Sequence, residues 1–224
     1  LGYSRLLVLV TSAFSSYSGC RQYLEDIELA MASIDSATSL VVDKIRPFYN
    51  SPGFIGAVQD NLAKTLEEFE GTPDEKVQIL FTAHSIPESM ANSCAYESQL
   101  IEACSLVMEK FGENPWRLVF QSRSGRPSQP WLEPDICDAV EGSDHVNIVV
   151  CPIGFVSDHM EVLFDLDLEA KNACENRGIK FARVPSVGTN PIFVSGIADL
   201  IEQRCGTLEN VLTLGVNGEW PNRC

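Results

Sequence analysis

Short apolar runs recur along the whole chain, and each of them ends in a polar, glycine or proline cluster. The six runs are residues 6–10, 40–42, 77–81, 117–120, 146–150 and 180–184. Continuous apolarity over so few residues is typical of strands that are buried on both faces. Helical patterns separate the runs, at residues 21–33, 54–69, 95–111, 160–176 and 191–203. This alternation predicts an α/β fold, in which parallel sheets are flanked by helices.

The composition excludes several classes of protein. Of the 224 residues, 45% are hydrophobic and 21% are charged, which is typical of a water-soluble globular chain. No uninterrupted apolar stretch reaches the roughly 18 residues of a membrane-spanning helix, so any membrane contact is expected to be peripheral. The 16 basic and 31 acidic residues give a net charge of -15, which opposes binding to the phosphates of nucleic acid. A small anionic ligand in a local basic pocket is compatible with this charge.

The eight cysteines have no CxxC spacing, and no signal peptide precedes them. We therefore expect reduced thiols and a cytoplasmic location. The chain begins at Leu1 without a methionine, enters an apolar run at once and stops at Cys224. These features lead us to expect a fragment of a longer protein.

Polar segments follow most of the predicted strands. In a parallel sheet the ligand crevice lies outside the carboxyl ends of the strands, so these segments are candidate binding elements. They are residues 11–20, 82–87, 121–127, 151–159 and 185–191. The acidic stretch at residues 67–76 contains glycine and proline and precedes a new strand, which makes it the best candidate for a domain boundary.

His84 lies just beyond the apolar run 77–81 and ahead of Pro87. Its imidazole can accept a proton near neutral pH or bind a metal ion through a nitrogen lone pair. The alternative is a loop histidine with a satisfied hydrogen bond, and the pattern alone favours neither. We expect His145 to be a solvated loop residue, and we expect His159 to serve a helix N-terminus more readily than a site.

Glu161, Asp165 and Glu169 are spaced four residues apart in a segment with a helical pattern, so they form a row along one side of the predicted helix. A straight α-helix drifts by about 40° per step, whereas a local π-type widening brings the row back toward alignment. Apolar residues surround the row and no lysine or arginine interrupts it, so partly buried carboxylates would repel one another and attract a cation or a proton. The pattern favours a metal or proton path, and the alternative is a solvated acidic face.

Two aromatic residues are further candidates for contact with a flat ligand. Tyr23 follows the hydroxyl-rich segment 11–20, which could line a pocket or could cap a helix. Trp131 is either a core aromatic or a stacking surface.

Four segments together resemble the ferrochelatase family. They are Phe81-Thr-Ala-His-Ser-Ile-Pro87, Phe120-Gln-Ser-Arg-Ser-Gly125 with Pro130-Trp-Leu-Glu-Pro134, Pro152-Ile-Gly-Phe-Val-Ser-Asp-His-Met-Glu161, and Asn190-Pro191. They occur in the family's order, and the likeness runs from about Leu6 to about Ile201. Residues 11–23 resemble the bacterial branch that inserts iron into coproporphyrin III.

The resemblance implies two Rossmann-like α/β domains with a porphyrin cleft between them, the first of which is incomplete in this chain. Residues 1–72 would be the remainder of the first domain, and residues 73–188 would be the second. Residues 189–224 would form a C-terminal helix that returns to the first domain, followed by a tail. The family's N-terminal porphyrin-contact region would precede Leu1.

The resemblance also implies roles for individual residues. His84 matches the family's catalytic, iron-contacting histidine, and Glu161 matches the glutamate that faces it across the porphyrin. Asp165 and Glu169 match the acidic ladder behind that glutamate, which adds them to His84 and Glu161 as implied metal ligands. Tyr23 matches a tyrosine that contacts the porphyrin.

The implied reaction is the insertion of Fe²⁺ into coproporphyrin III to give coproheme, in heme biosynthesis, with protoporphyrin IX as the alternative substrate. Trp131 lies within the matching motifs and joins the residues expected to bind the porphyrin. Coproporphyrin III carries more propionate groups than protoporphyrin IX, and Arg21, Arg123 and Arg126 are candidate partners for them. A non-catalytic tetrapyrrole or metal carrier, or a cobalt-inserting relative, is the competing interpretation. A carrier needs no acidic row beside its histidine, which favours the enzyme.

Some ferrochelatases hold a [2Fe-2S] cluster on one cysteine in the loop after the first strand and three near the C-terminus, and such clusters need four ligands as a rule. Cys20 and Cys224 match two of these positions, which makes them candidate cluster ligands in the full-length protein. The alternative is that both are ordinary reduced thiols.

Overall fold

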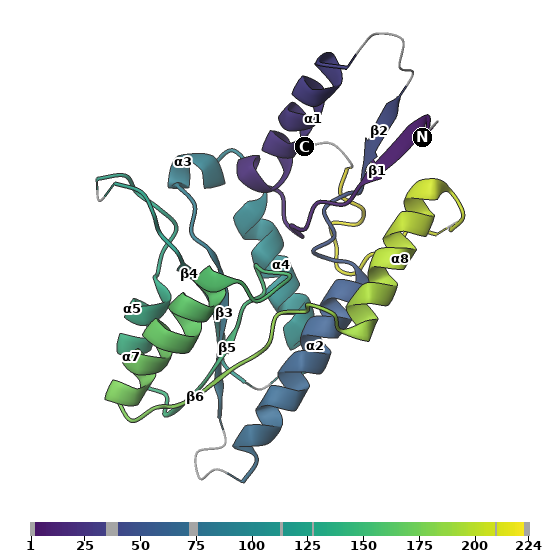
Figure 1. Ribbon diagram of the computed structural model, residues 1–224. Helices are drawn as coiled ribbons and strands as arrows, with labels where there is room; N and C mark the ends of the chain where they lie inside the picture. The colour runs from purple at the N-terminus through teal and green to yellow at the C-terminus, as the bar shows by residue number, and fades with distance from the viewer. Residues whose placement is uncertain are drawn as a thin grey trace.

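The computed structural model describes residues 3–34, 40–71, 76–112, 114–126, 128–208 and 210–221 (Figure 1). Two parallel sheets organise these residues. Strands β1 (Arg5–Val8) and β2 (Val41–Lys44) form the smaller sheet. The larger sheet has the strand order β4-β3-β5-β6, with bounds β3 (Gln78–His84), β4 (Trp116–Gln121), β5 (Asn147–Cys151) and β6 (Lys180–Arg183). All neighbouring strands pair in parallel, so the predicted α/β fold with parallel sheets and flanking helices is confirmed.

Alternate residues of β3 belong to two different hydrophobic clusters. Ile79 and Phe81 pack with apolar residues of α2 (Pro52–Leu66) and α4 (Tyr96–Met108). Leu80 packs with apolar residues of α5 (Ile136–Glu141) and of the helical segment 160–176. Because successive side chains of a strand point to opposite faces, helices cover both faces of the larger sheet. This double cover explains why every residue of β5 is buried.

Helix α8 (Pro191–Cys205) crosses α2 at a point where two glycines meet. A Cβ atom on Gly53 would lie 2.5 Å from the Cα of Gly196, so the two helices approach each other without side chains between them. Asn190 caps α8 by accepting a hydrogen bond from the Ile192 N–H at 2.9 Å. The chain after residue 188 therefore packs back against α2 (Figure 1).

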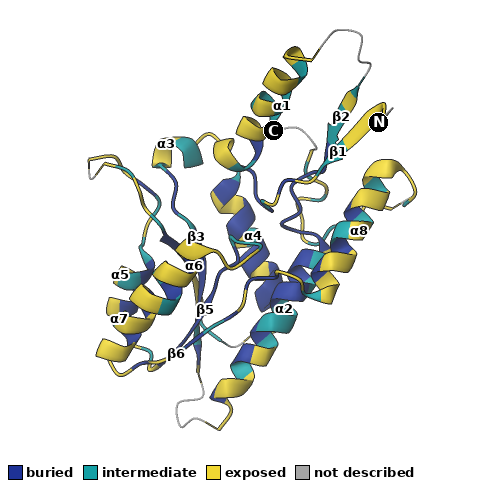
Figure 2. Ribbon diagram, in the orientation of Figure 1, coloured by how far each residue is buried: buried dark blue, intermediate teal, exposed yellow. Residues whose placement is uncertain are grey.

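The elements at the end of the molecule that contains β1 are the most exposed (Figure 2). Helix α1 (Gln22–Ala32) has no buried residue, and no residue of β1 is fully buried. Within the described ranges, none of the helices combines the length and the apolarity that a bilayer crossing requires.

The observed elements differ from the predicted ones where local structure is short or irregular. Strand β3 continues through His84, so the expectation that this histidine follows the strand is wrong. The segment 160–176 consists of α6 (Met160–Val162), the π-helix η3 (Leu163–Ala170) and α7 (Lys171–Asn176), which contains the widening that the acidic row led us to consider. Elements too short for a clear apolar period were not predicted: η1 (Tyr17–Arg21), α3 (Glu88–Ala91) and α5. The helix predicted at residues 54–69 ends in the 3-10 turn η2 (Glu67–Phe69).

The division of the chain into domains stays a prediction. The proposed boundary after residue 72 lies outside the described residues, as does Cys224. The larger hydrophobic cluster contains both Ile45, which follows β2, and Ile79 of β3. One continuous core therefore includes residues from beside both sheets.

Candidate active site

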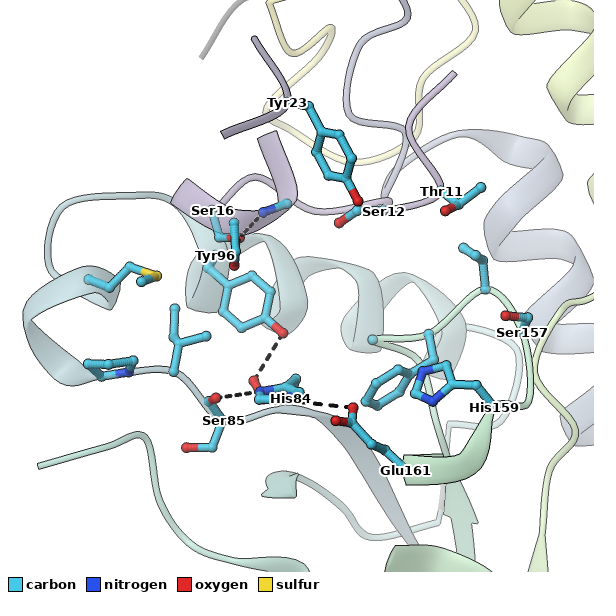
Figure 3. Close-up of a pocket in the computed structure, with 18 of the residues that line it drawn as sticks. Thr11, Ser12, Ser16, Tyr23, His84, Ser85, Tyr96, Ser157, His159 and Glu161 are labelled. Carbon is cyan, nitrogen blue, oxygen red and sulfur yellow. Dashed lines mark hydrogen bonds and ion pairs between the residues drawn. The ribbon is translucent and has the colours of Figure 1, made fainter. Parts of the chain in front are cut away.

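A cavity of about 510 Å³ lies at the carboxyl ends of β3 and β5 (Figure 3). Its lining comes mainly from three segments: residues 11–23 after β1, residues 84–96 from the last residue of β3 onward, and residues 154–161 after β5. The ends of parallel strands are the usual place for a ligand in this kind of fold, because the connecting segments diverge there. The polar segments that follow these strands in the sequence thus line one cavity.

His84 presents a defined nitrogen to this cavity. Its Nδ1 lies 2.6 Å from the carbonyl oxygen of Ser85, and a carbonyl can only accept a hydrogen bond. In the neutral ring Nδ1 therefore carries the hydrogen, and Nε2 keeps a free lone pair. The backbone is also fixed, because the Tyr96 hydroxyl donates to the His84 carbonyl at 3.1 Å. Burial raises the pKa of Tyr96, so this donor stays protonated.

Glu161 lies beside His84 at the cavity, and its carboxylate points toward the imidazole (Figure 3). Its Oε2 lies 3.9 Å from Nε2 of His84, which is beyond hydrogen-bond distance. The Glu161 side chain is 57% exposed, and the His84 side chain is 35% exposed. Both groups are therefore accessible to a ligand, and they do not form a hydrogen bond with each other. Together they offer one nitrogen and one carboxylate for protons or a metal ion.

The loop that leads to Glu161 is held against β3 by a glycine. The Gly154 N–H donates to the carbonyl of Thr82 at 3.0 Å. A Cβ atom on Gly154 would lie 2.7 Å from the Cα of Ala83, so only glycine allows this approach. The contact lies next to His84 in β3 and therefore fixes the spacing between the two walls of the cavity.

Asp165 and Glu169 lie on the π-helix outside the cavity lining. Asp165 is half-buried and accepts hydrogen bonds from Gln121 Nε2 at 3.1 Å and from the Ser122 hydroxyl, whereas Glu169 is exposed. Burial, followed by the nearby Asp135, Glu169, Asp138 and Asp165 carboxylates, raises the pKa of Cys137 to about 12. No group of three metal-ligand side chains forms in the part of the chain that the structure describes.

The acidic row therefore differs from the expected arrangement. Several of the apolar neighbours that were expected to bury it are themselves on the surface: Phe164 is 51% exposed and Leu168 is 53% exposed. A helix on the surface of a sheet buries only one side, and the buried side here carries Leu166 and Ala170. The structure brings His84 and Glu161 together, and the metal roles of Asp165 and Glu169 stay predictions.

Tyr23 and Trp131 both line the cavity. Tyr23 projects from the start of α1 and is 45% exposed (Figure 3). Trp131 is 8% exposed, so the two interpretations of this residue hold at once: it is a core aromatic, and it also forms part of the cavity wall. Its indole lies against Gly125, where a Cβ atom would collide with the ring, and its Nε1 is buried without a hydrogen-bond partner.

Tyr96 and His159 also line the cavity, and neither was predicted as a site residue. Tyr96 lies in a helix whose apolar pattern gives no signal for a cavity, and only the packing of α4 brings its hydroxyl to β3. His159 is the N-cap residue of α6, as expected, but its side chain makes no capping hydrogen bond. Instead it lines the cavity and lies edge-on to Phe155, with ring centroids 5.2 Å apart. The signal in the sequence that could have identified His159 as a cavity residue is the run of three polar residues at 157–159.

Cys20 is buried in η1 and is disulfide-bonded, so the expectation of a reduced thiol at this position is wrong. Cys224, the other candidate ligand of a [2Fe-2S] cluster, lies outside the described residues. A disulfide sulfur is not a thiolate, and the described residues contain no group of ligands around Cys20. In this structure the described residues do not fit such a cluster.

Comparison with known proteins identifies the family. Residues 1–205 match the ferrochelatase family model. The ferrochelatase of Rhodopirellula baltica is 49% identical over 227 residues, which cover 100% of this chain and 64% of that protein. The coproporphyrin III ferrochelatase of Streptomyces coelicolor is 41% identical over 225 residues, which cover 92% of this chain and 60% of that protein. The chain thus spans about 60% of the length of these curated relatives.

Solved structures show the same fold at low sequence identity. SirB from Bacillus subtilis has a TM-score of 0.60 at 11% identity, with 90% of this chain and 72% of that chain covered. CbiX, the terminal enzyme of siroheme biosynthesis in denitrifying bacteria, has a TM-score of 0.57 at 17% identity, with 89% and 76% covered. These likenesses support the fold, and the family model and the curated relatives support the family. This chain belongs to the ferrochelatase family.

Proposed function

We propose that the full-length protein inserts Fe²⁺ into a porphyrin, with coproporphyrin III as the substrate. The observation that carries this proposal is the pair formed by His84 and Glu161, whose Nε2 and Oε2 atoms face each other at 3.9 Å in the cavity of a ferrochelatase-family chain. A volume of about 510 Å³ falls within the usual range for small-molecule sites.

Metal insertion sets tasks that this pair suits. The pyrrole N–H protons must leave as the metal–nitrogen bonds form, and the incoming ion must lose its water ligands. The Nε2 lone pair of His84 can accept a proton or bind the ion, because Nδ1 is occupied by the Ser85 carbonyl. The Glu161 carboxylate can balance the charge of the ion or accept a proton. The 3.9 Å gap keeps both groups available for these tasks.

The choice of coproporphyrin III is supported by the relatives' names and by the hydroxyl groups of the cavity. Several relatives at about 40% identity are called coproporphyrin III ferrochelatase. The predicted arginine partners give weaker support, because Arg21 is paired with Glu25 at 2.9 Å and Arg123 with Glu133 at 3.8 Å. The lining contributes hydroxyls instead, and those that can donate to propionates are Thr11, Ser16, Ser18 and Ser157. The hydroxyls of Ser12 and Ser85 already donate to the backbone carbonyls of Phe14 and Leu132.

Zinc insertion into a fluorescent porphyrin tests the reaction on the full-length protein. We expect H84A and E161Q each to lower the turnover by roughly 10²- to 10⁴-fold, the range for loss of a general acid or base. Porphyrin binding should stay measurable in both variants. His145→Ala is the matched control, because this histidine lies in the loop before β5 and not in the cavity lining.

The same assay separates the alternatives. A tetrapyrrole carrier would bind the porphyrin without inserting zinc in the wild-type protein. A faster reaction with protoporphyrin IX than with coproporphyrin III would overturn the choice of substrate but not the reaction. H84A with the turnover of H145A would contradict the role of His84.

We also propose that the reaction takes place in the cytoplasm. Six cysteines of the described part are free thiols, which supports a reducing compartment: Cys94, Cys104, Cys137, Cys151, Cys174 and Cys205. Cys20 is the exception, because it is disulfide-bonded. Cell fractionation combined with thiol labelling of the exposed Cys205 tests the assignment.

A further inference from the structure

Arg183 ends β6 and forms ion pairs with two aspartates. Its Nε donates to Asp167 Oδ1 at 2.6 Å, and its Nη2 donates to Asp167 Oδ2 at 3.2 Å, which is a two-point contact. Its Nη1 donates to Asp158 Oδ1 at 3.0 Å. The planar guanidinium suits such a bridge, because its donors are held in a fixed fork.

The two aspartates bracket Glu161 along the chain. Asp158 lies in the loop that lines the cavity, three residues before Glu161, and it also accepts a hydrogen bond from the Ser186 N–H at 3.1 Å. Asp167 lies six residues after Glu161, in the π-helix. Arg183 therefore joins both sides of the segment that carries Glu161 to the end of a strand of the larger sheet.

Glu161 depends on this attachment for its position. In the described structure its carboxylate has no hydrogen-bond partner, and the ionisable group within 4 Å of it is the imidazole of His84, whose Nε2 lies 3.9 Å away. The helix that carries it begins at Met160 without a side-chain cap. A π-helix is also a rare conformation that occurs mostly as single-turn bulges, so we expect this eight-residue segment to need support from outside.

The arginine of these ion pairs is largely buried, whereas the two aspartates are partly exposed. The side chain of Arg183 is 13% exposed, against 32% for Asp158 and 38% for Asp167. Burial opposes the charge on Asp158, but the hydrogen bonds from Ser186 and Arg183 outweigh it and hold the pKa of Asp158 below its ordinary value. The carboxylate therefore stays ionised at neutral pH, and the bridge persists.

We propose that Arg183 is a positioning residue, which sets the distance from Glu161 to His84 by binding Asp158 and Asp167 at the same time. This inference rests on the proposed function. Arg183 does not line the cavity, so it acts through the loop and the π-helix and not through contact with substrate. Misplacement of a reacting group by about 1 Å can lower a rate by roughly 10²-fold, which is enough for a residue outside the cavity to matter.

The experiment compares R183Q with R204Q in the full-length protein. Arg204 is a matched control, because it too forms an ion pair with an aspartate, in its case Asp43 alone at 2.5 Å. It lies on α8, away from the cavity. We expect R183Q to lower kcat for zinc insertion by about 10- to 100-fold, with the KM for porphyrin within about twofold of wild type. R204Q should keep the wild-type kcat.

Hydrogen exchange of the backbone gives a readout besides activity. R183Q should speed exchange in residues 152–170, and R204Q should leave that segment unchanged. R183K keeps one charge but cannot bind both aspartates through a fork, so its exchange and kcat should lie between those of wild type and R183Q. If R183Q folds poorly, D158N removes one arm of the bridge while it keeps the side-chain shape.

A double variant separates positioning from general destabilisation. In an E161D background the carboxylate already lies off its position, so R183Q should lower kcat by less than about threefold. An equal effect of R183Q in both backgrounds would overturn the proposal, as would an R183Q enzyme with the kcat of R204Q. A wild-type protein that inserts no metal would overturn the proposed function instead. Backbone hydrogen exchange in R183Q and R204Q would then still decide whether Arg183 stabilises residues 152–170.

Discussion

Replacement of Gly154 by alanine tests whether backbone contact sets the geometry of the cavity. Gly154 joins the loop after β5 to β3, where its N–H donates to the Thr82 carbonyl. The new Cβ would lie 2.7 Å from the Cα of Ala83, and ordinary van der Waals contact begins at 3.4 Å. The neighbour is backbone, so it cannot rotate away. The loop and the strand must therefore separate by about 0.7 Å, the difference between these two distances.

This separation has consequences for stability and for rate. Overpacking of a tight site costs about 1–3 kcal/mol, and each kcal/mol lowers the Tm of a domain of this size by roughly 2–4 °C. We therefore expect the Tm to fall by about 2–12 °C. The displaced loop leads to Glu161, whose distance to His84 is only 3.9 Å. A shift approaching 1 Å should lower kcat for metal insertion by about 10- to 100-fold.

Thermal unfolding followed by circular dichroism and zinc insertion at a temperature well below the Tm measure the two effects separately. Gly112→Ala is the control, because a Cβ atom there meets nothing within 4 Å. A G154A protein with the Tm and kcat of G112A would show that the close approach to Ala83 is not needed. A lower Tm with an unchanged kcat would refute the link between this contact and the His84–Glu161 distance.

Three further predictions use other contacts of the described structure. Y96F removes the donor to the His84 carbonyl from a buried site and should lower the free energy of unfolding by about 1–3 kcal/mol, as measured by urea unfolding. G53A places a Cβ 2.5 Å from the Cα of Gly196 and should also destabilise the protein by about 1–3 kcal/mol, without the loss of kcat expected for G154A. The pKa of Asp158 is lowered in the folded state, because its hydrogen bonds outweigh the effect of burial, so its contribution to stability is present at neutral pH and is lost as the pH falls through that lowered pKa. The difference in Tm between wild type and D158N should therefore shrink below about pH 4, and a constant difference down to acid pH would contradict this sign.

The sequence by itself determined the class of fold. The six apolar runs correspond to the six strands that the structure describes, and the helical patterns at residues 54–69, 95–111 and 191–203 correspond to α2, α4 and α8. These elements are predictable because burial acts on consecutive or regularly spaced residues, so the apolar pattern is visible within a short stretch of the sequence. The position of His84 at a strand end was predictable for the same reason, although the strand includes the histidine. The motifs that carry the family resemblance were likewise local.

Only the tertiary structure decided how the site is assembled. The strand order β4-β3-β5-β6 makes β3 and β5 neighbours, and this pairing brings the segment with Glu161 to His84. No local pattern encodes which strands pair, because the choice depends on packing across the whole sheet. For the same reason the contacts of two residues could not be predicted from the sequence. The Tyr96 hydroxyl reaches β3 from α4, and Arg183 of β6 binds the π-helix. Contacts between residues far apart in the sequence leave no period in it, so the residues that fix the geometry of the cavity appear only once the chain has folded.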